Sequence, residues 1–357
     1  MRILYGIQGT GNGHITRARH MAKGFDERDD VVVDYFFSGR QQNGYFDMQV
    51  FGDYQMGRGL TFVTQNGKIH YSKTLTQNNL FTLIKEIKTM MVNDYDLVVN
   101  DFEPITAWAA KLAGIPSMSV SHQAAFMHQV PKHKQGLLDK VITNYFAPTS
   151  HCLGTHWYHF GYDIIPPFVS ADLCTHQTTN ALDNTLLVYL PFENTQLVRE
   201  QLHILSEYSF NCYHPEIKQP EQDRNINWQP LSSENFKRDL KKSSGVISNC
   251  GFELSTECLS LGKPLLVKPL DRQYEQLSNA YTLKEIGASQ VIHSLEAENI
   301  DEWLQQREGV RIQYPTNCRL LIDWIANGNW QDKKEICSTL WQQVTFPLPM
   351  KRKLEGI

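Results

Sequence analysis

The stretch GVISNCGFELSTECLSLGKPLLVKPLDRQYEQLSNAYTLKEIGASQVI, residues 245–292, carries the pattern that decides the fold. Residues 245–247 form a short apolar run that predicts a buried strand, and Gly251 then turns the chain. The segment 252–261 has a helical pattern, and residues 265–267 predict another strand. Strands that alternate with helices are typical of a parallel sheet covered by helices, so this stretch predicts an α/β domain.

The same alternation continues toward the N-terminus. Apolar runs that predict strands cover residues 3–7, 31–37, 97–100, 117–120 and 186–190. Apolar positions with helical spacing lie between and after these runs, in segments 80–91, 104–113 and 198–205. Residues 38–79 are rich in Gly, Gln, Asn and aromatic residues, break this rhythm and indicate an insertion.

A chain of 357 residues is long enough for two domains. The segment Ile165-Pro166-Pro167 and the polar stretch 175–184 interrupt the pattern, which predicts a first domain over residues 1–167 and a second α/β domain after it. Two further helical patterns, at 320–325 and 336–344, close the chain. In open α/β domains arranged in series, ligands bind at the carboxyl ends of the strands, in the cleft between the domains.

The composition narrows the class of protein. The chain is 41% hydrophobic and 20% charged, which is typical of soluble globular proteins, and its formal net charge of −4 gives nucleic-acid binding no electrostatic support. No stretch is long and apolar enough to span a bilayer, and the start MRILYG does not resemble a secretory signal. Seven cysteines without a CxxC pair predict free thiols. We therefore expect a cytoplasmic protein.

A glycine-rich loop, GTGNGH at residues 9–14, follows the first predicted strand and precedes a helical pattern. Glycines there leave backbone N–H groups bare at a helix N-terminus, which favours an anion, although a tight turn without a ligand is the alternative. His14 replaces the third glycine of a dinucleotide fingerprint, and no Gly-Lys-Ser/Thr follows, so NAD and Walker-type sites are excluded. Arg17 and Arg19 fit either phosphate contacts or a solvated helix face.

His14 is the first candidate for a general base, because a neutral imidazole at a cleft can take a proton from a hydroxyl. The alternative is a histidine that hydrogen-bonds a neighbouring loop. Asp101 and Glu103 follow the strand predicted at 97–100 and compete as bases, since both face the same cleft. Asp101 also fits orienting His14 or capping the next helix. His122, after the following strand, is a further candidate on the acceptor side.

The opening stretch also carries candidate ligand groups. Glu253 and Glu257 lie one turn apart on the predicted helix, and DRQYEQLSNA follows the carboxyl end of the next strand. A carboxylate near a helix start can accept hydrogen bonds from two vicinal hydroxyls, and Gln and Asn amides can bind a polyol. An ordinary βαβ unit with surface carboxylates is the alternative.

Three spaced motifs, G-x-x-x-x-x-E, G-K-P-x-L and E-Q-x-x-N-A, resemble the donor-site signature of GT-B glycosyltransferases. Among these the chain is most similar to the MurG-like group (glycosyltransferase family 28) and to a bacterial and archaeal branch of it, through the loop GTGNGH and the segments NDFEP and SHQ. The resemblance implies the GT-B fold, in which two Rossmann-like domains face each other across a cleft. It places the second domain at 168–316 and closing helices at 317–357 that cross back to the first.

Carried over position by position, the resemblance implies a donor site in the second domain. Glu257 matches the glutamate that holds the nucleotide ribose, and Gly251 with its helix matches the diphosphate site. Glu275, Gln276 and Asn279 match the loop that reads the donor sugar.

On the first domain, the resemblance implies that Gly11, Asn12 and Gly13, with His14, form the loop that faces the diphosphate and the acceptor. One position departs from the pattern. Asn249-Cys250 stands where many members have small or hydroxyl residues, which leaves the diphosphate contacts open.

The resemblance implies a glycosyltransferase, and we expect an inverting hexosyltransferase that moves a sugar from a nucleoside-diphosphate sugar, UDP-linked, to an unknown acceptor hydroxyl. Of the candidate bases weighed above, we assign His14 and Asp101 to catalysis. The resemblance implies no cofactor and no obligatory metal, since helix N-termini and basic residues stabilise the leaving group. Similarity to MurG implies a lipid or cell-envelope glycan as acceptor and peripheral contact with the inner face of the membrane, which the basic tail KRK at 351–353 favours.

Two alternatives stay open at this point: a non-hydrolysing sugar-nucleotide epimerase, which shares the fold, and a binding protein that holds a nucleotide sugar without turnover. A zinc site is not expected, although His151, Cys152, His156 and His159 cluster in sequence, because their spacing matches no common site.

Overall fold

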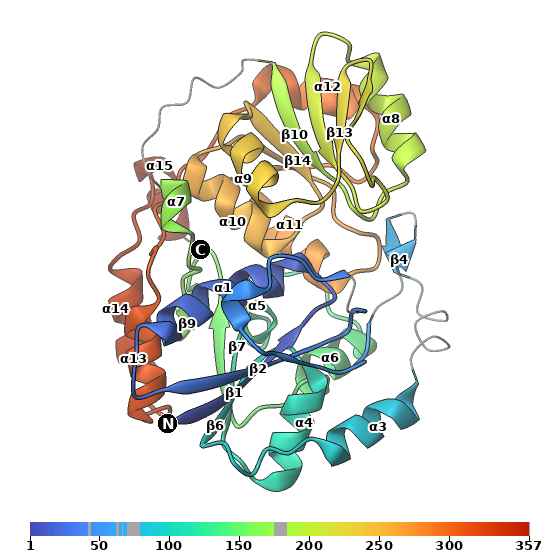
Figure 1. Ribbon diagram of the computed structural model, residues 1–357. Helices are drawn as coiled ribbons and strands as arrows, with labels where there is room; N and C mark the ends of the chain where they lie inside the picture. The colour runs from blue at the N-terminus through green and yellow to red at the C-terminus, as the bar shows by residue number, and fades with distance from the viewer. Residues whose placement is uncertain (42–43, 62–63, 66, 70–78, 175–183, 357) are drawn as a thin grey trace.

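The computed structural model describes residues 1–41, 44–61, 64–65, 67–69, 79–174 and 184–356. Two α/β domains lie one above the other in Figure 1, each built around a seven-stranded, largely parallel sheet, which confirms the predicted fold class. Residues 70–78 of the predicted insertion and residues 175–183 of the predicted polar linker lie outside the described residues.

The first sheet is parallel throughout, in the order β3-β2-β1-β6-β7-β8-β9. Its strands are β1 (Arg2–Gln8), β2 (Val32–Ser38), β3 (Gln55–Met56), β6 (Leu97–Asp101), β7 (Ser117–Ser121), β8 (His151–Thr155) and β9 (Ile164–Ile165). The helices of this domain are α1 (Asn12–Asp26), α3 (Leu80–Thr89), α4 (Pro104–Ala113), α5 (His122–Ala125) and α6 (Leu137–Tyr145), with a short 3₁₀ helix, η2 (Gln49–Phe51).

Part of the predicted insertion belongs to the first domain. The aromatic rings of Phe51 and Tyr54 pack edge-on against Phe37 of β2, and β3 pairs with β2 at the edge of the sheet. The two-stranded hairpin formed by β4 (Thr64–Gln65) and β5 (Lys68–Ile69) follows. Its turn reaches the second domain, because Gly67 N donates to Phe192 O at 2.7 Å and Gly67 O accepts from Asp271 N at 2.9 Å.

The second sheet has the order β12-β13-β11-β10-β14-β15-β16, in which β12 is antiparallel to β13 and the other pairs are parallel. Its strands are β10 (Thr185–Tyr189), β11 (Ser209–Tyr213), β12 (Glu221–Asp223), β13 (Ile226–Gln229), β14 (Gly245–Ser248), β15 (Leu265–Val267) and β16 (Gln290–Val291). The helices are α7 (Ala171–Cys174), α8 (Thr195–Ile204), α9 (Ser233–Lys242), α10 (Phe252–Leu261), α11 (Tyr274–Glu285) and α12 (Ala297–Gln306).

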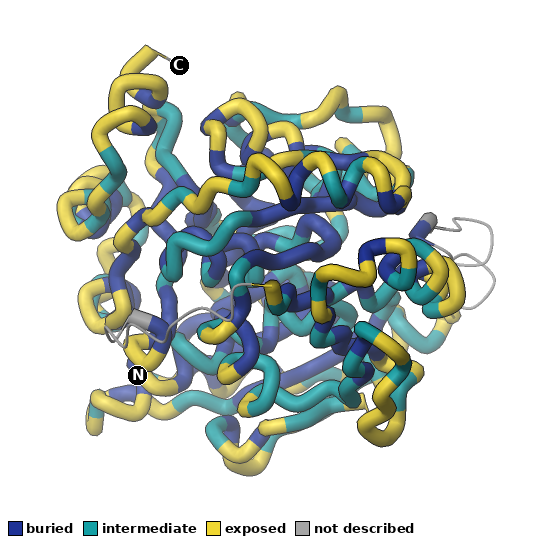
Figure 2. The backbone as a smooth tube through the Cα atoms, turned by 90° about the horizontal axis from the view of Figure 1, so that it is seen from above, coloured by how far each residue is buried: buried dark blue, intermediate teal, exposed yellow. Residues whose placement is uncertain are grey.

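The last part of the chain is shared between the two domains. Helices α13 (Arg319–Asn327) and α14 (Lys334–Trp341) bury Leu321, Ile325 and Leu340 in the core of the first domain. Helix α15 (Leu348–Leu354) instead adds Met350 and Leu354 to the core of the second. These helices run along one side of both domains in Figure 1, and Figure 2 shows the buried chain running through the interior beneath exposed outer helices.

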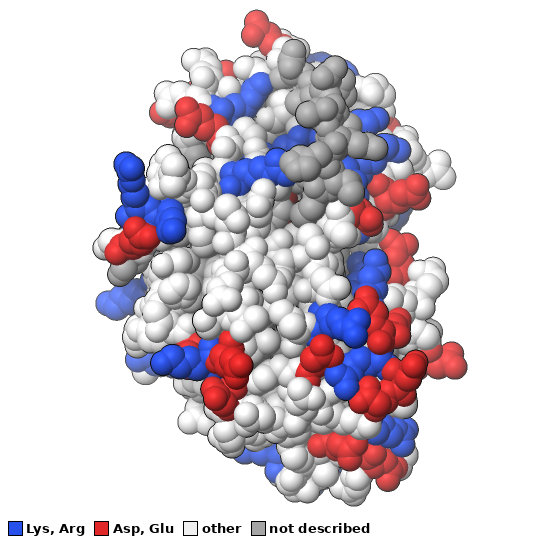
Figure 3. Space-filling model, turned by 90° about the vertical axis from the view of Figure 1, so that its left-hand side faces the viewer, with Lys and Arg blue, Asp and Glu red and all other residues white. Residues whose placement is uncertain are grey.

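The charge on the surface, and the length and apolarity of the helices, indicate which classes of partner the protein can have. On the face shown in Figure 3, lysine and arginine are interspersed with aspartate and glutamate, and much of its middle carries no charge, which matches the small net charge of the chain. Within the described residues, no helix combines the length and apolarity that crossing a membrane requires.

Candidate active site

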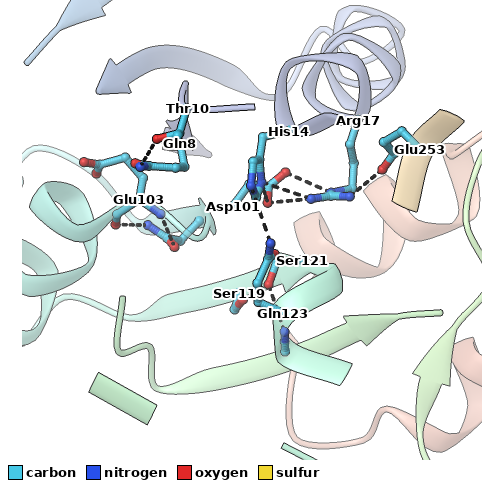
Figure 4. Close-up of polar contacts among 12 residues, drawn as sticks. Gln8, Thr10, His14, Arg17, Asp101, Glu103, Ser119, Ser121, Gln123 and Glu253 are labelled. Carbon is cyan, nitrogen blue, oxygen red and sulfur yellow. Dashed lines mark hydrogen bonds and ion pairs between the residues drawn. The ribbon is translucent and has the colours of Figure 1, made fainter. Parts of the chain in front are cut away.

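A cluster of charged side chains lies where β6 and α1 meet (Figure 4). His14 and Arg17 are three residues apart on α1, so they share one face of the helix, and Asp101 is the last residue of β6. His14 Nδ1 lies 2.8 Å from Asp101 Oδ1. Arg17 donates to both oxygens of the same carboxylate, through Nε at 2.8 Å and Nη2 at 2.7 Å.

The contact with Asp101 fixes which histidine nitrogen is free to act as a base. A carboxylate only accepts hydrogen bonds, and Asp101 Oδ1 lies closer to Nδ1 (2.8 Å) than the Arg17 Nη2 donor does (3.2 Å). We therefore assign the proton to Nδ1 of His14 and the lone pair to Nε2. The Asp101 side chain is fully buried. Burial acts to raise the pKa of its carboxyl, but Arg17 and His14 outweigh that effect and lower it. Asp101 is therefore an anion that can orient His14 and stabilise the imidazolium after proton uptake.

Arg17 also joins the two domains. Its Nη1 donates to Glu253 Oε1 on α10, and the Arg17 residue is only 8% exposed. A solvated helix face, one of its two expected environments, is therefore wrong. Burial raises the pKa of the Glu253 carboxyl to about 7, against the opposing influence of Arg17. The guanidinium thus connects the carboxylate beside His14 to the helix that is expected to hold the donor diphosphate.

The glycine loop is shaped in part by the second domain. A Cβ atom on Gly13 would lie 3.2 Å from Glu253 Cγ, so the close approach of α10 leaves little room for a side chain there. Gly11 precedes α1, and within the described residues no side chain caps this N-terminus. Asn12 bridges the domains, because its Nδ2 donates to the Tyr189 hydroxyl at 3.1 Å while its Oδ1 accepts from Arg40 at 2.9 Å.

On the second domain, α10 begins at Gly251 directly after β14, which leaves the helix N-terminus at the strand ends. No side chain among the described residues caps it. Glu257 lies one turn into this helix, and no described group donates a hydrogen bond to its carboxylate. Burial raises the pKa of this carboxyl to about 7, although Lys237 acts to lower it.

The polar residues before Gly251 are held in place but are not fully paired. Asn249 Nδ2 donates to Glu193 Oε1 at 3.2 Å and to Lys268 O at 2.9 Å, and Glu193 and Lys268 form a buried ion pair at 2.9 Å. Asn249 Oδ1 and Ser248 Oγ are buried and have no hydrogen-bond partner in the described part of the chain. Unpaired buried polar atoms are rare in folded proteins, so their position beside the N-terminus of α10 marks this place as a candidate part of the donor site.

The three residues expected to read the donor sugar differ in their surroundings. The Glu275 carboxylate accepts from Gln123 Nε2 at 2.9 Å, across the contact between the two domains. Gln276 Oε1 accepts from the backbone N of Leu270 at 2.9 Å, within its own loop. Asn279 is fully buried and uses both ends of its amide, through Nδ2 to Cys250 O at 3.0 Å and Oδ1 to a ring nitrogen of His122 at 2.7 Å. It therefore joins the domains and offers no free amide atom.

His122 and Glu103, placed on the acceptor side by the sequence, are structural in this arrangement. The His122 ring stacks on Phe252 with centroids 3.9 Å apart, and its Nδ1 bonds to Thr155 O at 2.9 Å. The Glu103 carboxylate caps α4, accepting from the backbone N of Ile105 and Thr106 at 2.9 and 2.6 Å, and it also binds Ser38 Oγ at 2.6 Å. Both side chains are buried and fully engaged, so neither is free to act as a base.

The sequence marked Glu253 as a candidate ligand group but not as the partner of Arg17, and Gln123 was missed as a member of this site. Glu253 stands in the first turn of the donor helix, where a carboxylate is ordinary and gives no signal of a partner in the other domain. Gln123 follows β7 within the segment SHQ, which the resemblance singled out without a function for that residue. Among the described residues, no group of three or more His, Cys, Asp and Glu is arranged to hold a metal ion.

Comparisons with known proteins identify the family. Residues 1–307 match the family described as Glycosyl transferase family 1. The chain belongs to glycosyl transferase family 1. Among curated proteins, none matches it. Family membership decides between the alternatives left open above, because it makes this chain a glycosyltransferase of the GT-B type rather than an epimerase or a binding protein.

Solved glycosyltransferase structures share this fold. The glycotransferase of kitacinnamycin has a TM-score of 0.56 and 13% identity, over 85% of this chain and 90% of that one. The glycosyltransferase SnogD from Streptomyces nogalater has a TM-score of 0.53 and 14% identity, over 86% and 91%. MurG of Acinetobacter baumannii has a TM-score of 0.52 and 15% identity, over 100% and 98%. At these identities, the likeness establishes the GT-B fold and leaves the substrates open.

Proposed function

We propose that this glycosyltransferase moves a sugar from a nucleoside-diphosphate sugar, UDP-linked, to an acceptor hydroxyl, with inversion at the anomeric carbon and with His14 as general base. The observation that carries the proposal is the 2.8 Å contact between His14 Nδ1 and the buried Asp101 carboxylate, which leaves Nε2 as the basic atom. A histidine oriented by a buried carboxylate is suited to taking a proton from a hydroxyl at neutral pH.

The reaction is a direct displacement. The acceptor oxygen forms a bond to the anomeric carbon while the bond from that carbon to the diphosphate oxygen breaks. The acceptor proton moves to His14 Nε2, and the electron pair leaves with the nucleoside diphosphate. Attack from the side of His14 inverts the configuration, because the donor lies on the other side of the reacting carbon, on the second domain.

The residues expected to hold the donor are placed as this direct displacement requires, on the second-domain side of the reacting carbon. The uncapped N-terminus of α10 can accept the leaving diphosphate, and the Glu257 carboxylate, which accepts no hydrogen bond from a described group, can take the ribose hydroxyls. We propose that backbone N–H groups and the helix dipole stabilise the negative charge, so that a divalent cation is not obligatory. Transfer rates measured with EDTA and with added Mg²⁺ test this: equal rates support it, and loss of transfer in EDTA contradicts it.

Thermal stabilisation by a panel of nucleotides and nucleotide sugars is the first experiment. A selective rise in Tm with one nucleoside diphosphate and its sugars names the donor. Release of that nucleoside diphosphate, and NMR of the product anomer, then test transfer and inversion. A retained anomeric configuration contradicts direct displacement, and the absence of any nucleotide-dependent shift contradicts the donor site at Glu257.

We propose that the acceptor is a lipid or a cell-envelope glycan and that the enzyme works in the cytoplasm, at the inner face of the membrane. Helix α15 supports this, because the exposed side chains of Leu348 and of the basic residues 351–353 lie together on one short segment. Co-sedimentation with vesicles that contain anionic lipid tests the contact. Binding that is lost when residues 351–353 are all replaced by glutamine supports it, and no binding contradicts it.

A further inference from the structure

Gln123, near the start of α5, lies below His14 in Figure 4 and contacts both His14 of the first domain and Glu275 of the second. Its Nε2 donates to Glu275 Oε2 at 2.9 Å and lies 3.5 Å from His14 Nε2, the atom left free to take a proton. Its Oε1 is buried and has no hydrogen-bond partner among the described residues. One end of this amide is therefore engaged across the cleft, while the other is left unpaired beside the reacting centre.

The neighbours of Gln123 fix the orientation of its amide. If the side chain were flipped, Oε1 would face the carboxylate oxygen of Glu275, and two acceptors would be in contact. The lone pair of His14 Nε2 likewise favours an N–H group on that side. The Oε1 atom thus points away from both partners, and a buried carbonyl oxygen without a hydrogen bond is costly unless a ligand supplies the donor.

We propose that Gln123 reads the acceptor: its Oε1 accepts a hydrogen bond from a second hydroxyl, adjacent to the hydroxyl that His14 deprotonates. This inference rests on the proposed function, in which His14 is the base. It assigns the acceptor to the polyols, such as a sugar ring with neighbouring hydroxyls, rather than to alcohols or phenols with one isolated hydroxyl.

The geometry of a primary amide supports this assignment. The oxygen and nitrogen of an amide are held close together in one plane, so a molecule that places one hydroxyl at His14 Nε2 brings its neighbouring hydroxyl near Gln123. Two oxygens on adjacent carbons are separated by about the length of a hydrogen bond. The hydrogen bond between Gln123 and Glu275 joins the two domains, so the proposal requires the domains to separate before the acceptor reaches the amide.

The test uses the donor named by the thermal-shift panel and matched pairs of acceptors. Methyl glucopyranoside and its monodeoxy analogues are the probes, since each analogue lacks one hydroxyl beside a candidate reacting position. We expect wild-type kcat/KM to fall about 100-fold for the analogue that lacks the adjacent hydroxyl, because a buried group is then left unpaired. Gln123→Met keeps the side-chain length and removes the acceptor atom. It should lower kcat/KM for the parent sugar by a similar factor, mainly through KM, and bring the two acceptors to equal rates.

Two comparisons separate this effect from general damage. Ser119→Ala, on the neighbouring strand β7, should leave the ratio of parent to deoxy acceptor unchanged. Glu275→Asp keeps an accepting carboxylate on this side of Gln123 and should alter the KM for the donor rather than that ratio. Unchanged Tm and an unchanged thermal shift with the nucleotide show that Gln123→Met is folded and binds the donor.

The inference is overturned if wild-type enzyme treats parent and deoxy acceptors alike, or if Gln123→Met preserves the ratio between them. It is also overturned if no glycoside is used while donor turnover to water still depends on His14. Failure of the proposed function has a different signature, which is donor turnover that is indifferent to His14→Ala.

Discussion

On the first-domain side of the cleft, His14, Asp101 and Arg17 hydrogen-bond to one another, and both oxygens of the buried carboxylate are used. On the second-domain side, no described group donates a hydrogen bond to Glu257, and the buried Oδ1 of Asn249 has no described partner. The base is therefore assembled before any substrate arrives, whereas the donor side holds buried polar atoms that are not paired within the described residues.

This difference separates two requirements of catalysis. A base must be oriented in advance, because reorientation during the reaction would add to the barrier. A binding group gains most from a ligand when its hydrogen bonds are not already used within the protein. Substitutions on the two sides should therefore have different signatures, with losses of rate and folding stability on the first domain and losses of affinity on the second.

The largest effect is expected from His14→Ala. Loss of the general base should lower kcat by about 10³-fold, while affinity for the nucleoside diphosphate changes by less than about twofold. Initial rates and isothermal titration measure the two quantities. His293→Ala, an exposed histidine of the second domain, is the matched control and should behave as wild type. A His14 variant that keeps its rate would remove this residue as the base.

Asp101→Asn should affect both rate and stability. Arg17 then keeps a buried charge without its main partner, so the free energy of unfolding should fall by about 3 kcal/mol, and kcat should fall by about 10²-fold as His14 loses its orientation. Urea unfolding and initial rates provide the measurements. Asp34→Asn is the control, because its ion pair with Arg2 is 33% and 49% exposed and should cost less than about 1 kcal/mol. Equal losses from the two variants would contradict the assignment of a buried, preassembled base.

Glu257→Gln should weaken binding of the nucleoside diphosphate and leave the rate of the transfer step nearly unchanged. Loss of a charged acceptor for the ribose hydroxyls corresponds to about 2 kcal/mol, or roughly a 30-fold rise in Kd. Titration calorimetry gives the Kd, and saturating donor gives kcat. Glu298→Gln, an exposed carboxylate in the first turn of α12, should leave the Kd unchanged. A kcat that collapses at saturating donor would place Glu257 in the chemical step instead.

The smallest effect is on the pH dependence of stability. The pKa of the Glu257 carboxyl is about 7 in the folded protein, above its ordinary value of 4.5, so the folded chain binds more protons than the unfolded chain between these values. Its contribution therefore lowers the free energy of unfolding as the pH rises from 5 to 8. Measured by urea unfolding, the decrease in the free energy of unfolding from pH 5 to pH 8 should be about 1–2 kcal/mol smaller in Glu257→Gln than in wild type. Parallel pH profiles would show that Glu257 does not titrate in this range.

The elements with strong local patterns could be predicted from the sequence. The alternation at 245–267 gave β14, α10 and β15, because buried parallel strands are short apolar runs and a glycine begins the helix between them. Strands β8 and β11 were missed, since His151, Cys152 and Asn211 place polar or ambiguous residues in short strands. Pairing with neighbouring strands, which local composition does not reveal, is what makes these segments strands.

Many residues of the candidate site could be predicted from the sequence, but the contacts between them could not. His14 and Asp101 were singled out because each follows a strand end, and parallel strands bring such ends to one edge. Glu103 and His122 also follow strand ends and were expected at the cleft for the same reason. The Glu103 carboxylate instead caps its own helix, and the His122 ring joins the two domains. The bond between Arg17 and Glu253 links residues 236 positions apart, and no local pattern predicts it.

The path of the last helices has a consequence for how the two halves of the protein move and melt. The chain passes from the first core to the second after β9, returns in α13 and α14, and leaves again for α15. Three chain connections between the two domains permit rotation about a shared hinge and prevent one domain from moving independently of the other. Because segments from the end of the chain are packed into both cores, unfolding of one core pulls on segments that belong to the other. We therefore expect the two domains to unfold in a single transition rather than in two.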